Sequence, residues 1–304
     1  MSKGLHINKL YDIVLYIVIM YIEEVVQVQI VPIDTGRNTI KLINKKQFRS
    51  VVGDWQKRNL SNDGDYTVEI NNEKFFVGNL ALTESISPRE MTTESKIHSE
   101  TKTLFLTALG LTTTEEKPFI ITGVPITQFN QETKENLEKL LCGNYTIKIN
   151  DFPTKYVSIN NITIAPEGGA SFWYALSKNP LLQYGKKRII DLGSRTINYA
   201  TINDKQYINK DSGTLSYGCL KLKDDKITPE QLASKIVADL SQKWMEYNSD
   251  KDMILLTGGG TLILGKILKT YFKNCETIDD PVFSNVQGYY KMGVEKWAKQ
   301  TVVR

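Results

Sequence analysis

The alternation of apolar and polar positions predicts strands interleaved with helices from about residue 28 onward. Val28–Ile33, Asn38–Ile43 and Phe48–Val52 each have the length and apolar content of a strand. Tyr66–Ile70 and Lys74–Val77 flank an Asn-Asn pair, which predicts a tight hairpin. The folded unit therefore opens as a run of short strands.

Helices enter the pattern after these strands. Apolar residues recur at helical spacing over Glu94–Leu109. Pro118–Thr122 predicts a buried strand, and Thr127 is placed to cap a helix ending near Leu141. In the second half, strands are predicted at Ile159–Ala165, Arg188–Asp191, Thr196–Ile202, Lys205–Ile208 and Met253–Thr257, and helices at Ala170–Ser177, Pro229–Tyr247 behind an N-cap at Thr228, Leu262–Phe272 and Gly288–Val302. This alternation is typical of an α/β fold in which helices cover the sheets.

An unbroken apolar run, Ile13–Ile22, precedes the first predicted strand. It is shorter than the roughly 20 residues that a membrane-spanning helix needs. No small-x-small cleavage pattern follows it, so a secretory signal is disfavoured. We expect residues 1–29 to be an N-terminal extension that is disordered or foreign to the folded unit.

The charge and cysteine content of the chain argue against some classes of binding partner and site. The chain of 304 residues has 38 Lys and Arg against 34 Asp and Glu, a formal net charge of +4. This mild excess gives no electrostatic case for direct nucleic-acid binding. The 3 cysteines and 2 histidines lack the spacing of a disulfide framework or a zinc site. We therefore expect a cytoplasmic, reducing location.

One motif occurs twice: an apolar strand that ends in Asp-x-Gly before a polar turn, at Asp34–Gly36 and at Asp191–Gly193. Glycine lets a backbone approach an anion closely, and the amides of a tight turn can point at phosphate oxygens. Lys41 follows the first copy as a cation able to reach a terminal phosphate. Each copy alone is better explained as an ordinary turn between strands. The pair predicts two related halves that face each other across a cleft.

A third glycine-rich element, Gly258–Gly260, ends the predicted strand Met253–Thr257 and leads into a predicted helix. Bare backbone at a helix N-terminus suits a nucleotide. The element has neither the Gly-Lys-Ser/Thr of a Walker loop nor the GxGxxG of a Rossmann fold. A plain strand-to-helix turn remains an equal explanation for the triplet alone.

Taken in this order, the three elements resemble the actin-like ATPases, and most closely the plasmid-segregation actins of the ParM and AlfA type, nearest to AlfA. Gly123–Pro125 after a strand and Pro281–Gly288 before the last helix extend the resemblance over about residues 30–300. It implies an actin-like, ribonuclease H-like two-domain fold with a central nucleotide cleft. Domain I would comprise 30–165 plus 284–304, and domain II would comprise 166–283.

The resemblance also implies roles for individual residues. Asp34 and Asp191 would hold Mg²⁺ through water, and Glu167, at the head of the connecting helix, would position the attacking water. The alternative for Glu167 is a carboxylate that is only stabilised by the helix dipole; the resemblance to the family favours the catalytic role. ATP or GTP, and ADP after hydrolysis, would be contacted by Gly36, Arg37, Asn38, Lys41, Gly193, Ser194, Arg195, Thr196, Gly258, Gly259 and Gly260.

Two departures from the family pattern stand out. Asn198 occupies a position where the family often has Asp, which leaves one carboxylate fewer beside the second motif. The stretch between Asp191 and Gly258 is too short for an inserted lobe beyond a strand meander and a long helix. We therefore expect subdomain IIB, which normally covers the cleft, to be lacking, as in AlfA.

The function expected from this resemblance is a nucleotide-dependent, filament-forming ATPase that segregates low-copy plasmid DNA. The chain would associate with itself head to tail and reach DNA through a small adapter protein bound at a plasmid centromere, without contacting DNA or membrane directly. The alternatives are a monomeric phosphotransferase of the sugar- or acetate-kinase kind and a cell-shape or division actin. The first needs additional substrate-binding chain, and the second often has an amphipathic membrane helix, which the uniformly apolar Ile13–Ile22 does not resemble.

Overall fold

The computed structural model describes residues 29–58, 66–93, 95–224, 227–244, 247–248 and 250–301. The run Ile13–Ile22 and all but the last residue of the predicted extension lie outside these ranges. Gln29 is described, and its side-chain amide donates to the carbonyl oxygen of Thr112 at 3.1 Å. Within the described ranges, no helix combines the length and the apolar character needed to cross a lipid bilayer.

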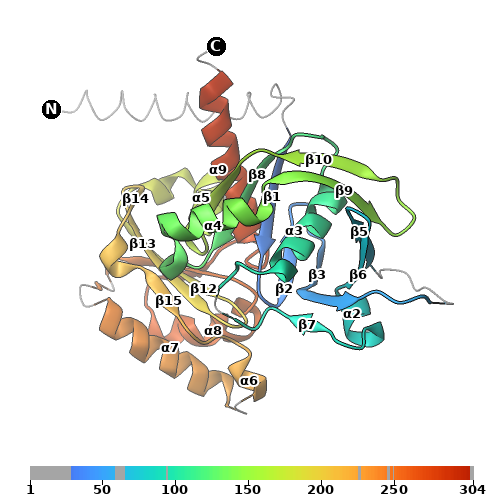
Figure 1. The fold of residues 1–304 in the computed structure, drawn as a ribbon. Helices are drawn as coiled ribbons and strands as arrows, with labels where there is room; N and C mark the ends of the chain where they lie inside the picture. Colours follow the sequence, from blue (N-terminus) through green and yellow to red (C-terminus); the bar gives the residue numbers. More distant parts are fainter. Residues whose placement is uncertain are drawn as a thin grey trace.

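Two of the sheets repeat one topology (Figure 1). The first sheet has the order β11-β8-β1-β2-β3, from β1 (Ile30–Thr35), β2 (Thr39–Leu42), β3 (Gln47–Arg49), β8 (Phe119–Val124) and β11 (Ile162–Pro166). The second sheet has the order β14-β13-β12-β16-β17, from β12 (Lys186–Leu192), β13 (Ile197–Asn203), β14 (Gln206–Tyr207), β16 (Met253–Thr257) and β17 (Cys275–Thr277), with β15 (Gly213–Leu215) paired to β13. In each, the central strand pairs antiparallel with the next strand and parallel with a later one. The two related halves predicted from the repeated motif are therefore present.

A third sheet, called here the side sheet, flanks the first. It consists of β10 (Lys155–Ile159), β9 (Gly143–Ile149), β5 (Tyr66–Ile70), β6 (Glu73–Val77), β4 (Val51–Asp54) and β7 (Arg89–Glu90), in that order. The predicted hairpin joins β5 to β6, and Asn71 and Asn72 have positive φ angles of 50° and 72°. Asparagine tolerates this left-handed conformation, which a tight hairpin turn requires at both central positions.

Helices cover both central sheets, and one short helix, α2 (Asn79–Glu84), packs on β4 and β6 of the side sheet. The others are α3 (Ser99–Thr112), α4 (Gln131–Leu141), α5 (Gly169–Lys178), α6 (Lys221–Asp224), α7 (Pro229–Lys243), α8 (Thr261–Tyr271) and α9 (Ser284–Thr301), with short 3-10 turns η1 (Ile126–Gln128), η2 (Pro180–Gln183) and η3 (Asn209–Asp211). On the first sheet, Ile33 packs toward Leu104 of α3, whereas Ile121 packs toward Tyr289 of α9. Successive strand residues point to opposite faces, so both faces of the sheet are buried.

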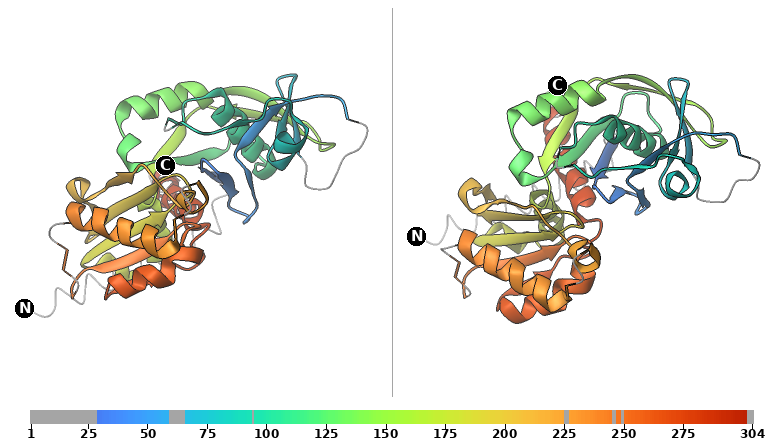
Figure 2. Two further views of the ribbon diagram at one scale, coloured as in Figure 1. Left: turned by 90° about the horizontal axis from the view of Figure 1, so that it is seen from below. Right: turned by 60° about the horizontal axis from the view of Figure 1, so that its bottom comes forward.

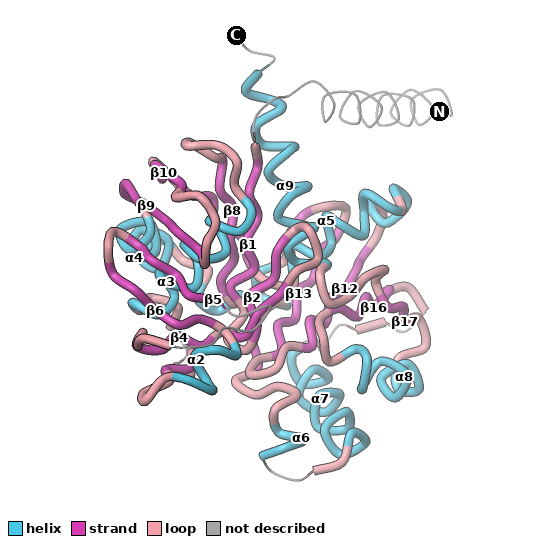
Figure 3. The backbone as a smooth tube through the Cα atoms, turned by 90° about the vertical axis from the view of Figure 1, so that its right-hand side faces the viewer, coloured by secondary structure: helices cyan, strands magenta, loops and turns pink. Residues whose placement is uncertain are grey.

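The second sheet is covered in the same way. Ile190 belongs to the core cluster with residues of α7 and α8, and Ile189 to the cluster with Phe172 of α5. Figure 2 shows the two halves as separate lobes, and Figure 3 shows α9 running beside α5 and β1 at their junction. The C-terminal helix therefore returns to the first half, and the chain crosses between the halves at α5 and again at α9.

Thr127 does not cap a helix, contrary to prediction. Residues Ile126–Gln128 form η1, and α4 begins at Gln131 behind Asn130. The Asn130 side chain accepts a hydrogen bond from the backbone N–H of Thr133 at 2.9 Å. Asparagine is among the strongest N-cap residues because its side-chain oxygen reaches this amide. The predicted cap at Thr228 is present, with its side chain and that of Gln231 exchanging hydrogen bonds with each other's backbone.

Several element boundaries also differ from prediction. The predicted strand Ile159–Ala165 is the end of β10 and most of β11, which belong to different sheets. Helix α7 ends at Lys243 instead of Tyr247, and α9 begins at Ser284 instead of Gly288. Such ends depend on packing partners that local periodicity does not contain.

Candidate functional site

A cleft of about 370 Å³ lies where the ends of β1 and β12 face each other. In α/β sheets, ligands bind in the crevice beyond the carboxyl ends of the strands. The cleft brings together all the site residues predicted from the sequence: Asp34, Gly36, Arg37, Asn38, Lys41, Glu167, Asp191, Gly193, Ser194, Arg195, Thr196, Gly258, Gly259 and Gly260.

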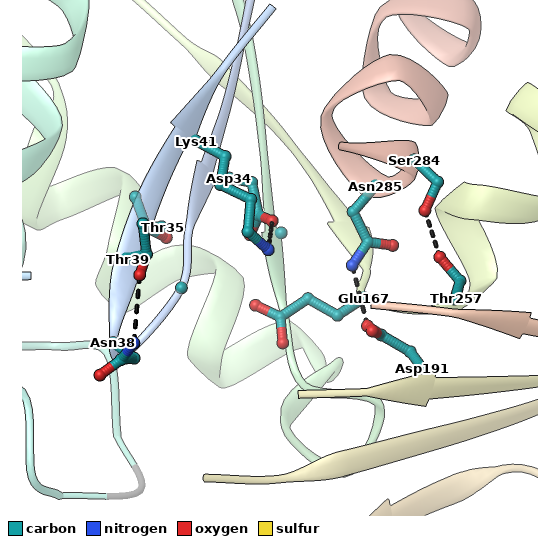
Figure 4. A network of polar contacts seen from close by, with 12 residues as sticks. Asp34, Thr35, Asn38, Thr39, Lys41, Glu167, Asp191, Thr257, Ser284 and Asn285 are labelled. Carbon is teal, nitrogen blue, oxygen red and sulfur yellow. Dashed lines mark hydrogen bonds and ion pairs between the residues drawn. The ribbon is translucent and has the colours of Figure 1, made fainter. Parts of the chain in front are cut away.

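The first hairpin, β1 and β2 with their turn, carries a carboxylate and its cation. The strand register sets Lys41 opposite Asp34, and Lys41 Nζ donates to Asp34 Oδ2 at 3.2 Å (Figure 4). Burial alone lowers the pKa of Lys41, but the charges of Asp34 and Asp191 outweigh it and raise this pKa above its ordinary value. Lys41 is therefore held as a cation at the wall of the cleft.

The second hairpin, β12 and β13 with their turn, has the same register but different partners. Asn198 lies opposite Asp191, in the place that Lys41 has opposite Asp34. Asp191 accepts instead from Asn285 Nδ2 of α9 at 2.8 Å (Figure 4). Burial raises the pKa of Asp191 to about 6, although Lys41 and the bond from Asn285 oppose this. Asp191 is therefore charged at neutral pH, and its negative charge has only a neutral hydrogen-bond donor beside it.

The turns of the two hairpins have matching close approaches. A Cβ on Gly36 would lie 2.6 Å from Thr39 O, and one on Gly193 would lie 2.5 Å from Thr196 O. A side chain at either position would collide with the carbonyl three residues later, so the tight turns require glycine.

The glycine triplet joins β16 to α8 against the second hairpin. Gly258 has a φ of +84°, and a Cβ there would lie 2.4 Å from Asp191 Oδ1. The amide of Gly260 donates to Leu192 O at 2.8 Å, which fixes the start of α8 beside the end of β12. A Cβ on Gly259, in contrast, would meet nothing within 4 Å. Within the triplet, Gly259 thus presents open backbone, whereas Gly258 and Gly260 are packed against the protein.

Glu167 occupies the middle of the cleft wall, after β11 and before α5, and is 8% exposed. Figure 4 shows its carboxylate between the Asp34–Lys41 pair and the Asp191–Asn285 pair. One carboxylate oxygen forms an ion pair with Lys96, and the other accepts from Asn198 Nδ2 at 3.3 Å. Each carboxylate oxygen of Glu167 therefore has one partner within the protein and keeps acceptor capacity at the wall of the cleft.

Sequence reasoning missed Lys96 and Asn285 as cleft residues, and treated Asn198 only as a missing carboxylate. All of them line the cleft. Lys96 stands in a polar segment before α3 with no motif around it, so the sequence offers no signal for it. Asn285 lies in the Pro281–Gly288 segment that carried part of the family resemblance, which was the available signal.

The side chains that line the cleft restrict the kind of metal ion that it could bind. Among the described residues, no group of three or more His, Cys, Asp or Glu is placed to hold a metal ion directly. Mg²⁺ commonly keeps several waters and takes only one or two carboxylates. Asp34 and Asp191 on facing hairpins fit a hydrated ion of this kind, and the undercompensated charge of Asp191 favours a cation nearby.

Comparison with known proteins agrees with this architecture. Residues 32–169 match the family model of the actin-like proteins' N-terminal domain. No curated protein matches the chain by sequence.

Solved structures of actin-like proteins have the same fold. A 15-stranded ParM filament from Clostridium botulinum is 23% identical, covers 89% of this chain and 100% of that chain, and has a TM-score of 0.76. The archaeal actin homologue Ta0583 in complex with ADP is 18% identical over 88% of this chain and 99% of that chain, with a TM-score of 0.70. The AlfA filament bound to AMPPNP is 18% identical over 89% of this chain and 99% of that chain, with a TM-score of 0.65. The chain therefore has the actin-like fold of ParM- and AlfA-type proteins, with a first half that matches the N-terminal domain of actin-like proteins.

Proposed function

We propose that the cleft binds and hydrolyses a nucleoside triphosphate, ATP or GTP. The observation that carries this proposal is the meeting of two Asp-x-Gly hairpins, a buried glutamate and a glycine triplet with open backbone at Gly259 in one cleft. The backbone of the two hairpin turns offers amides for phosphate oxygens. Lys41 adds a positive charge that reaches the β- and γ-phosphates, and Gly258–Gly260 lines the adenosine or guanosine.

Asp34 and Asp191 would hold a Mg²⁺ ion through water molecules. When bound, the ion neutralises charge on the phosphates. The chain's own residues would then orient the nucleotide, exclude bulk water and fix the position of the attacking water. Phosphoryl transfer has a loose transition state, so orientation and electrostatics matter more than proton removal. Glu167 is the residue proposed to orient that water.

We further propose that the chain assembles head to tail into filaments and segregates plasmid DNA through an adapter. Similar structures are described as a ParM filament and as an AlfA filament bound to AMPPNP. A heterologous contact that does not close generates an open filament. The net charge of +4 suits an indirect arrangement in which a separate protein contacts the DNA.

We also propose that the chain lacks subdomain IIB. Between β13 and β16, the described residues form β14, η3, β15, α6 and α7, and the meander and helices pack on the second sheet. With no further lobe over the cleft, closure around the nucleotide would depend on contacts between subunits.

The test is right-angle light scattering of the purified protein with Mg-ATP, Mg-GTP, Mg-ADP or no nucleotide, followed by negative-stain microscopy and a phosphate-release assay. We expect scattering and filaments only with a triphosphate, and phosphate release that increases once filaments form. A protein that hydrolyses nucleotide but stays monomeric at high concentration would refute the filament proposal. It would favour the monomeric phosphotransferase, which small acceptors would then test. Absence of both binding and hydrolysis would refute the whole proposal.

A further inference from the structure

Lys96 is an almost inaccessible lysine at the bottom of the cleft, and its side chain is 1% exposed. It donates to Gly123 O at 2.9 Å and to Thr35 Oγ1 at 3.2 Å, and forms the ion pair with Glu167 Oε1. A lysine ammonium has three donors and no acceptor. All three are therefore used within the protein, and none is left for a ligand.

The second oxygen of Glu167 is held from the other side by Asn198. The Asn198 carbonyl oxygen accepts from Thr214 Oγ1 at 2.7 Å and from the backbone N–H of Ile126 at 3.3 Å. These two donors fix the orientation of the amide, so its Nδ2 group must face Glu167 Oε2. An aspartate at 198 would offer only acceptors and would place a second negative charge against the first.

The two groups that hold Glu167 come from different halves of the molecule. Lys96 precedes α3, which covers the first sheet, whereas Asn198 belongs to β13 of the second sheet. Glu167 itself lies where the chain passes from β11 of the first sheet into α5. Its carboxylate is thus fixed by one donor from each side of the cleft.

We propose that Lys96 and Asn198 are positioning residues that together hold the Glu167 carboxylate in the orientation needed to align the attacking water. This inference rests on the proposed nucleotide hydrolysis. Neither residue needs to touch the nucleotide. A misplacement of about 1 Å at a reacting group can cost about a hundredfold in rate. Their contribution is therefore expected in the rate of hydrolysis and not in nucleotide affinity.

Lys41 differs from Lys96 in the way this proposal requires. Its side chain is 18% exposed and lines the cleft, and its contact in the cleft is Asp34. Lys41 can therefore turn toward a phosphate, whereas Lys96 would have to give up three internal bonds to do so.

The first experiment compares the wild type with K96M, which keeps most of the length of the side chain and removes its ammonium group. The matched control is K155M, because Lys155 is a half-buried lysine that donates to Gly110 O and Thr113 O far from the cleft. Affinity is measured with a fluorescent ATP analogue, assembly by pelleting with AMPPNP, and hydrolysis as phosphate released per pelleted subunit. For K96M we expect hydrolysis to fall by about a hundredfold while affinity and assembly stay within threefold of the wild type. K155M should hydrolyse at the wild-type rate.

K96M with wild-type hydrolysis would overturn the proposal, as would a loss confined to nucleotide affinity. If K96M alone does not fold, the double variant K96M/E167Q removes both members of the ion pair together. Residues that act as a unit are not additive, so the double variant should retain the same residual rate as E167Q. A further tenfold loss would mean that Lys96 acts on the nucleotide itself, and would overturn the proposal as well.

Asn198 is tested by N198D and N198A. We expect N198D to reduce hydrolysis more than N198A, because it adds a repelling charge as well as removing a donor. Equal rates in both variants and the wild type would contradict the role of Asn198. A wild-type protein that binds and hydrolyses no triphosphate would refute the proposed function itself, an outcome distinct from any difference between variants.

Discussion

The first hairpin and the second hairpin have the same backbone at the cleft but different compensation of their carboxylates. In the first, Asp34 has its own cation, Lys41, directly across the strand pair. In the second, the equivalent position holds Asn198, which turns to Glu167, and Asp191 is left with a neutral donor from α9. The two halves repeat one topology, but only the first hairpin pairs its aspartate with a lysine.

This difference leaves the carboxylate of the second hairpin with less compensation of its charge than that of the first. Its Asp191 is buried with a pKa raised to about 6, and its backbone is packed against the glycine triplet. The first hairpin brings a self-contained ion pair to the cleft. The second depends on α9 and on the turn after β16 to fix its geometry.

The largest effect is expected from removing the cation of the first hairpin. The K41M variant should bind Mg-ATP or Mg-GTP about a hundredfold more weakly, because a charge-assisted bond to phosphate is worth about 1.5–3 kcal/mol. The measurement is a titration with a fluorescent triphosphate. K45M is the control, since Lys45 pairs with Asp280 at the surface. Unchanged affinity in K41M would show that the two hairpins do not differ in the way described.

The next effect concerns the packing of the second hairpin against the glycine triplet. G258A should weaken nucleotide binding by about tenfold, because a left-handed residue with a Cβ costs about 1–2 kcal/mol and the Cβ would collide with Asp191. G259A is the matched control, as its Cβ would meet nothing within 4 Å in the protein. Both variants are measured by nucleotide titration and thermal unfolding. If G259A weakened binding as much as G258A, the loss would come from blocking the nucleotide and not from displacing Asp191.

The smallest effect separates the two aspartates in the nucleotide-free protein. D191N should raise the unfolding temperature at neutral pH by a few degrees, because it removes a buried charge whose penalty is of the order of 1–3 kcal/mol. D34N should lower it, because Lys41 would lose its partner. Differential scanning fluorimetry without nucleotide measures both. Shifts of the same sign would contradict the comparison of the hairpins.

The difference in unfolding temperature between D191N and the wild type should depend on pH with a definite sign. The pKa of Asp191 rises from 3.8 to about 6 on folding, so the folded state binds the proton more tightly than the unfolded chain. The stability from this group is fully present below about pH 4 and is lost as the pH rises through about 6. The advantage of D191N over the wild type should therefore be small at low pH and complete above about pH 7. A difference that does not vary with pH would exclude Asp191 as its source.

The sequence predicted the parts of the cleft that depend on local chemistry. Each Asp-x-Gly turn and the Gly258–Gly260 turn are set by a strand that ends beside a glycine, and all of them line the cleft. The hairpin at Asn71 and the capping box at Thr228 were also predicted, because a few neighbouring residues decide them. The prediction at Thr127 was wrong because a stronger cap, Asn130, stood three residues later.

The contacts that hold Glu167 and Asp191 could not be predicted in this way. Lys96 reaches Glu167 across 71 residues of sequence, and Asn285 reaches Asp191 across 94. A lone lysine in a polar segment has the same local pattern whether it ends in solvent or at the bottom of a cleft.

The sequence by itself determined the α/β alternation, the two hairpins and the residue types that meet at the cleft, because strand periodicity and glycine turns are local properties. Only the tertiary structure decided which partner each carboxylate has. That choice depends on how α3, α5 and α9 pack against the two sheets. Because the carboxylates are buried, the loss of a hydrogen-bond partner costs free energy that water cannot restore.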